Sequence, residues 1–78
     1  MRKLYVVQTR IGPYYIGRDR NGRFHPMEGD ESLGSYATPE QAVDDLAGGH
    51  TFSPPSGIDT ATLGIPADLG EWAREGGS

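Results

Sequence analysis

Cysteine is absent from this sequence of 78 residues. A chain without a thiol forms neither a disulfide nor a thiolate metal site, so neither can compensate for a small core. Long apolar runs are also absent. No stretch approaches the ~20 apolar residues of a membrane-spanning helix, and Leu4–Val7 is too short for the core of a signal peptide. We therefore expect a small cytoplasmic protein with a thin core, most simply a monomer, that makes no contact with a membrane.

Catalytic and metal-binding motifs are also missing. The two histidines, His25 and His50, do not have the spacing of a metal motif, and a zinc site would need both of them together with carboxylates. The glycines from Gly12 to Gly22 are not followed by the Gly-Lys-Ser/Thr of a phosphate loop. No Gly-x-Ser-x-Gly elbow occurs either. We expect a protein that is not an enzyme and that uses neither a metal ion nor another cofactor.

Positive charge is scarce after the first third of the chain. Residues 28–78 contain ten acids and only Arg74, a formal charge of −9, whereas residues 1–27 contain six Lys or Arg and one acid, a formal charge of +5. The net charge of −4 therefore conceals a basic N-terminal third beside an acidic remainder. This asymmetry makes the N-terminal third the place to look for a surface that meets an acidic partner.

The clearest local signal is a capped helix in the middle of the chain. Thr38 is a preferred N-cap residue, Pro39 is tolerated at the first helical position, and Gln41 stands at capping-box spacing. Gly48 and Gly49 follow as residues that readily end a helix. The apolar stripe between them consists of Ala42, Val43, Leu46 and Ala47. The pattern predicts a helix of roughly nine to eleven residues, which is too short to be stable unless another layer packs against it.

Runs rich in β-branched and aromatic residues precede this helix and predict strands. They are Lys3–Gln8, Tyr14–Asp19, Arg23–Met27 and a short run, Leu33–Tyr36. Asn21-Gly22 is a strong hairpin signal, because both positions of the two-residue turn favour a positive φ. Pro26 cannot donate to a sheet ladder, so the third run should lie at an edge, carry a bulge or stop there.

These elements predict an α+β fold, a three- or four-stranded antiparallel meander packed against one short helix over residues 1–49. Residues 50–78 are rich in Pro, Gly and Ser, and a disordered tail is one interpretation. Their recurring apolar residues favour an irregular strap that packs on the same single domain. A short last helix that starts at Pro66 should bury Trp72, and the final residues, 75–78, should fray.

Strand alternation divides the side chains between two sheet faces. The residues expected beneath the helix are Val6, Ile16, Phe24 and Leu33. The opposite face would then carry Tyr5, Tyr15, Arg23 and His25. A single bulge would exchange the faces.

The candidate binding residues are Arg18, Arg20, Arg23, Tyr15 and His25. The three arginines bracket the Asn21-Gly22 turn, and guanidinium suits planar acceptors such as carboxylate and phosphate. We predict a binding or regulatory module that contacts an acidic protein partner through a basic aromatic sheet face. Nucleic-acid binding through the same face is the alternative. Self-association, or charges that are merely solvated, are further interpretations.

The order strand, hairpin, strand, followed by LGSYATPEQAVDDL, resembles two related families of DNA-binding modules. These are the ethylene-response-factor type domain of plants and the arm-binding domain of phage integrases. The resemblance covers about residues 14–47, and the matching residues are Leu33, Gly34, Tyr36, Thr38, Gln41 and Ala42. It implies a three-stranded sheet backed by a helix, with DNA read by arginines and aromatics of the exposed sheet face. Here these would be Arg18, Arg20, Arg23 and Tyr15, with His25 beside them. The chain is acidic overall, whereas nucleic-acid modules are usually basic.

Overall fold

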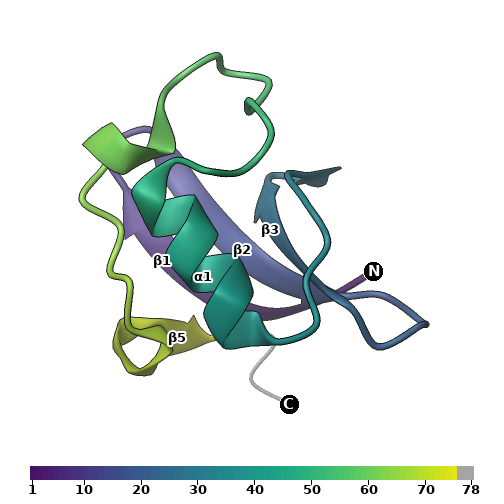
Figure 1. Cartoon of the computed structure of the whole chain (residues 1–78). Coiled ribbons are helices and arrows are strands. Elements are labelled where there is room, and N and C mark those ends of the chain that lie inside the picture. The colour runs from purple at the N-terminus through teal and green to yellow at the C-terminus, as the bar shows by residue number, and fades with distance from the viewer. Residues whose placement is uncertain (76–78) are drawn as a thin grey trace.

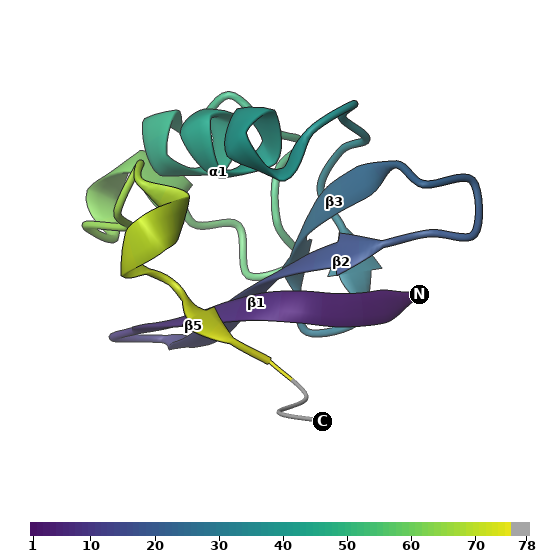
Figure 2. The ribbon, with the colours of Figure 1, turned by 90° about the horizontal axis from the view of Figure 1, so that it is seen from below.

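The structure is a computed structural model that describes residues 1–75. One α-helix lies on one face of a five-stranded antiparallel sheet, so the predicted α+β fold is confirmed (Figures 1 and 2). The strand order is β4-β3-β2-β1-β5. In chain order the elements are β1 (Arg2–Thr9), β2 (Gly12–Arg18), β3 (Phe24–Glu28), β4 (Glu31–Ser32), α1 (Pro39–Gly48), the 3-10 turns η1 (Thr60–Thr62) and η2 (Leu69–Glu71), and β5 (Ala73–Arg74).

The centre of the sheet is the predicted meander of β1, β2 and β3. Two very short strands extend it, because β4 pairs with β3 and β5 pairs with β1. The strand predicted at Leu33–Tyr36 is misplaced, since the residues that pair with β3 are Glu31–Ser32. Leu33 instead leaves the sheet edge and buries its side chain, and Tyr36 makes only an isolated bridge to Phe24. Packing of Leu33 into the core thus overrides its strand propensity.

Pro26 lies inside β3, which continues through it to Glu28. On the outer side of β3, Phe24 exchanges backbone hydrogen bonds with Tyr36, and the Leu33 N–H donates to the Pro26 carbonyl at 2.7 Å. By strand alternation the nitrogen of Pro26 faces this same outer side, away from β2, where only the two-residue strand β4 pairs with β3. The missing N–H therefore removes no bond to β2, which explains why the sheet tolerates the proline.

A β-bulge in β1 changes which of its side chains face the helix. Leu4 is an extra residue between Lys3 and Tyr5 relative to the register of β2. Tyr5 therefore pairs with Ile16 and packs against the core beneath α1, whereas Val6 lies on the opposite face. The predicted positions of Tyr5 and Val6 are exchanged for this reason, because one extra residue shifts the alternation by one.

Helix α1 begins and ends as predicted. The Gln41 N–H donates to the Thr38 hydroxyl at 3.2 Å, and Gly49 caps the other end with a φ of 74°. The predicted stripe packs onto the sheet, with Ala42, Val43 and Leu46 fully buried. The helix is therefore held by its contact with the strands that precede it.

The chain after α1 returns over the core. Ile65 and Trp72 are buried in the same hydrophobic cluster as the helix stripe, and the Trp72 indole N–H donates to the Pro66 carbonyl at 3.1 Å. The predicted last helix is only a 3-10 turn, η2, whose first residues are capped by the Asp68 side chain. Phe52 remains 74% exposed and adds nothing to the core. Residues 76–78, for which fraying is predicted, lie outside the described residues.

Among residues 1–75, no helix has the length and apolar character needed to cross a membrane.

Candidate functional site

The loop between β2 and β3 carries the predicted basic cluster, but its turn type differs from the prediction. The Gly22 N–H donates to the Asp19 carbonyl at 3.0 Å, and the Asp19 N–H donates to the Arg23 carbonyl at 3.0 Å. The loop therefore has three residues, 20–22, and only Gly22 has a positive φ, of 81°. This geometry is consistent with a type I turn followed by a left-handed glycine rather than a two-residue turn with Asn21 at positive φ.

The Asp19 side chain explains the longer loop. Its Oδ1 accepts the N–H groups of Asn21 at 2.8 Å and Arg23 at 3.0 Å, while its Oδ2 lies 2.7 Å from the Nε2 of His25. The hydrogen bond with His25, followed by that from the Arg23 N–H, holds the pKa of the Asp19 carboxyl below its usual range. This carboxylate is therefore committed to holding the turn.

The structure separates the three predicted arginines. Arg18 lies on the helix side of the sheet, directly opposite Arg2 of β1, with its guanidinium carbon 5.8 Å from the centroid of the Phe24 ring. Arg23 turns to the outer edge of β3, where its guanidinium donates to the Ser35 hydroxyl at 2.6 Å and carbonyl at 3.2 Å. Arg20 is exposed within the loop.

The other two predicted residues lie on the opposite sheet face, and both are already engaged. The Lys3 ammonium sits 4.3 Å from the centroid of the Tyr15 ring and also pairs with Asp30 at 3.1 Å. The second ring nitrogen of His25, Nδ1, lies 2.8 Å from the Ser32 hydroxyl, and the His25 side chain is only 12% exposed. The five candidates therefore do not form one surface.

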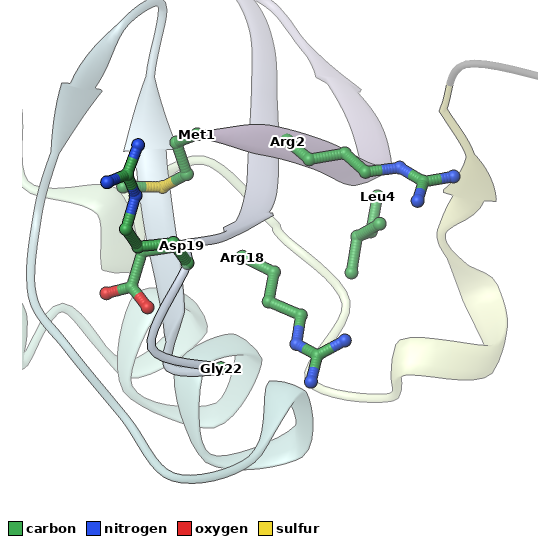
Figure 3. Close-up of a pocket in the computed structure, with 7 residues that line it drawn as sticks. Met1, Arg2, Leu4, Arg18, Asp19 and Gly22 are labelled. Atoms are coloured by element: carbon green, nitrogen blue, oxygen red, sulfur yellow. The ribbon is translucent and has the colours of Figure 1, made fainter.

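A hollow of about 660 Å³ brings two of them together with residues that sequence reasoning missed (Figure 3). Arg2, Arg18 and Arg20 line it, and Met1 and Leu4 add apolar surface. Figure 3 shows Leu4 between the side chains of Arg2 and Arg18. We call this site the arginine hollow; it lies at the end of the sheet where the N-terminus and the β2–β3 loop are found (Figure 2).

The lining of the arginine hollow has a net positive charge, because three arginines outnumber its one acid, Asp19. Like charges directly opposite each other across two strands repel, and Arg2 and Arg18 have this arrangement. Within residues 1–75, neither an ion pair nor a hydrogen bond connects Arg2, Arg18 or Arg20 to an acid. Asp19 also lines the hollow, but its oxygens serve the turn and His25. Such a site can hold a carboxylate or another planar oxyanion.

No metal-type cluster adds a second chemistry, because no group of three or more His, Asp or Glu side chains that could hold an ion forms within residues 1–75. No protein-family model matches the chain, and neither curated proteins nor solved structures gave a match. The resemblance to sheet-plus-helix DNA-binding modules stays a prediction. A function must therefore be inferred from the arginine hollow itself.

Proposed function

We propose that this chain is a small non-catalytic binding module whose arginine hollow receives an acidic group of a partner protein. The observation that carries the proposal is the cross-strand pair Arg2 and Arg18, which lie opposite each other in the register of β1 and β2 and form no ion pair with an acid within residues 1–75. The free protein bears the cost of this repulsion. An acid bound in the arginine hollow would reduce that cost and gain charge-assisted hydrogen bonds from a guanidinium group.

The apolar part of the arginine hollow favours a protein partner. Leu4 and Met1 lie beside the guanidinium groups, and Met1 is 58% exposed. A protein segment can present a carboxylate next to an apolar side chain, which matches this mixture of charge and apolar surface. We therefore expect the partner segment to combine an Asp or Glu with a neighbouring aliphatic residue.

Nucleic-acid binding is the second candidate, and the arginines themselves support it because guanidinium also binds phosphate. A nucleic-acid strand carries a regular row of phosphates and gains most from a long basic track. On β1–β3, the face away from the helix carries only Lys3 and His25 as basic side chains, and Lys3 is paired with Asp30. This face of β1–β3 therefore lacks the long basic track from which a nucleic-acid strand would gain most.

The proposal is tested by titrating the full chain with two fluorescent probes, an acidic Leu-Glu-Leu-Asp peptide and a mixed-sequence single-stranded oligonucleotide, at low and moderate salt. We expect the peptide to bind and to keep most of its affinity when salt is added. Oligonucleotide binding should fall steeply with salt, because released counterions drive it. Tighter binding of the oligonucleotide at moderate salt would favour the second candidate.

Matched charge reversals locate the contact. Arg2→Glu with Arg20→Glu should abolish peptide binding and leave the fold intact, because neither side chain is buried. Arg10→Glu with Arg74→Glu changes the net charge equally outside the arginine hollow and should bind at least half as well as the unmodified chain. Because Arg10 donates to the Thr62 carbonyl, circular dichroism first establishes that both double variants are folded. Equal losses in two folded double variants would show that only the overall charge matters, and the proposal would then be wrong.

A further inference from the structure

A second hollow, of about 470 Å³, lies at the opposite end of the sheet. Its walls come from the β1–β2 turn, the turn between β3 and β4, and the strap after α1, and all three segments lie in the upper half of the view in Figure 1. Apolar side chains from the turn and the strap line it, among them Ile11, Pro13 and Ile58. Ile11 is 45% exposed, so part of this apolar wall lacks a packing partner within the chain.

The polar centre of this hollow is the half-buried carboxylate of Glu28. The hydroxyls of Tyr14 and Ser56 donate to Oε2, the latter at 2.7 Å, and the Ser56 N–H donates to Oε1 at 3.0 Å. A carboxylate has about four lone-pair sites, so one acceptor position remains open. Desolvation alone would raise the pKa of Glu28, but the hydrogen bonds from Tyr14 and Ser56 outweigh it, and this pKa lies below its usual range.

Glu28 is therefore an anion whose partners are all neutral. Within residues 1–75, no Lys, Arg or His forms an ion pair with it. A negative charge in a partly apolar hollow is compensated best by a cation. Burial and the hydrogen bond to Glu28 also raise the pKa of Tyr14 to about 12, so the Tyr14 hydroxyl keeps its proton and adds no second negative charge.

The rim of the hollow shows how this chain already holds an ammonium group. The Lys3 ammonium rests over the Tyr15 ring and against the Asp30 carboxylate, a combination of cation–π contact and ion pair. Tyr15, Lys3 and Asp30 all line the hollow. Counting Glu28, Asp30 and Lys3, the formal charge of the hollow is one negative unit.

We propose that this hollow binds a small organic ammonium ion with an apolar body. The ammonium group would lie beside the open acceptor position of Glu28, and the apolar body would cover Ile11 and Ile58. The site is independent of the arginine hollow, because the two share no lining residue and carry charge of opposite sign.

Three probes of similar shape test the proposal on the full chain by NMR chemical shifts. They are benzylammonium, benzyl alcohol and benzoate. Benzylammonium should shift the amide signals of Gly12, Gly29 and Ser56, and these shifts should saturate at millimolar concentrations of the probe. Benzyl alcohol should bind at least about tenfold more weakly, because it cannot form a charge-assisted hydrogen bond. Benzoate should not bind there. Equal binding of the three probes, or no saturable shift with benzylammonium, would overturn the proposal.

Three variants sharpen the result. Glu28→Gln keeps one acceptor oxygen for the hydroxyls of Tyr14 and Ser56 and loses only the acceptor of the Ser56 N–H. It should weaken benzylammonium binding by about tenfold without changing that of benzyl alcohol. Ile11→Ser, at an exposed position, should weaken both. Lys3→Met frees the Tyr15 ring and Asp30 and should strengthen benzylammonium binding, a gain that general damage to the fold cannot produce. An unchanged or lower affinity in Lys3→Met would contradict the proposed charge of the site.

Arg20→Gln is the matched control at the other end of the sheet. It should leave the affinity for all three probes unchanged, and a change as large as that in Glu28→Gln would place the binding at the arginine hollow instead.

Discussion

The two ends of the sheet treat their charged side chains in opposite ways. At the strap end, Glu28 is hydrogen-bonded to Tyr14 and Ser56, and Lys3 is paired with Asp30. At the hairpin end, three arginines line the arginine hollow, and none of them forms an ion pair with an acid within residues 1–75. The strap end therefore uses its charges mainly to fasten distant parts of the chain, whereas the hairpin end leaves its charges available. That difference is the reason for placing partner binding at the hairpin end.

The ends also differ in how the chain builds them. The strap end joins segments from three parts of the sequence, with Glu28 of β3 holding Ser56 of the strap. The hairpin end is formed by the first residues and a single turn, which Asp19 holds locally. We expect the local stability of the strap end to depend on long-range packing. The local stability of the hairpin end should depend mainly on its charges.

The largest expected effect on stability comes from a substitution in the core, which supports both ends of the sheet. Leu46 is fully buried between α1 and the sheet, so Leu46→Ala should lower the free energy of unfolding by about 2–4 kcal/mol. Urea titration followed by tryptophan fluorescence and by far-ultraviolet circular dichroism measures this change. The two transitions should coincide. Separate transitions, or a loss below about 1 kcal/mol, would show that the helix is not the common support.

A smaller effect should be confined to the strap end. Glu28→Ala leaves the buried Tyr14 hydroxyl and the Ser56 N–H without their acceptor, which should cost about 1–3 kcal/mol. Amide hydrogen exchange should accelerate most at residues 54–58. The amides of the β2–β3 loop should change only as far as global stability changes, and a larger local acceleration there would show that the two ends are coupled.

Acidification should weaken both ends, since each depends on a carboxylate. The pKa values of Glu28 and Asp19 lie below their ordinary values of 4.5 and 3.8. The stability they contribute is therefore present above those values and is lost as the pH falls through the lower folded-state values. The free energy of unfolding should decline from about pH 5 downward. Glu28→Gln should flatten this decline, and an equally steep curve in that variant would exclude Glu28 as a contributor.

The smallest expected effect has the opposite sign. Arg2→Gln removes one of two arginines that lie opposite each other in the strand register, so at low salt it should leave stability unchanged or raise it by up to about 1 kcal/mol. The gain should shrink at high salt, which screens the repulsion. Arg10→Gln is the contrast, because Arg10 donates to the Thr62 carbonyl and its loss should destabilise. A clear loss of stability in Arg2→Gln would mean that Arg2 has a structural role.

Local signals in the sequence were sufficient for the helix and for the position of the hairpin. The cap at Thr38 and the glycine stop at Gly49 act through neighbouring backbone groups, so their effect can be predicted without knowing the rest of the fold. The turn type could not be predicted in the same way. It depends on Asp19 accepting two backbone N–H groups while His25 holds its second oxygen, and His25 is brought there by the pairing of β2 with β3.

The arginine hollow could be predicted only in part, for a similar reason. The excess of basic residues before residue 28 was visible, but the partners of Arg18 depend on the register of β1. The bulge at Leu4 fixes that register, and the Leu4 carbonyl accepts the N–H of Glu75 from the far end of the chain. No local sequence pattern predicts such a contact. The sequence therefore does not identify Arg2 and Leu4 as part of the site, and the faces predicted for Tyr5 and Val6 are wrong.

The most direct measurement of the central proposal follows the arginine side chains themselves. The Nε–Hε NMR signals of the full chain are recorded while the acidic Leu-Glu-Leu-Asp peptide is added at low salt. Binding in the arginine hollow predicts saturable shifts with one common affinity for Arg2, Arg18 and Arg20, and little change for Arg10 and Arg74. Shifts of similar size at all of these arginines, or none at Arg2 and Arg18, would contradict a binding site at the hairpin end.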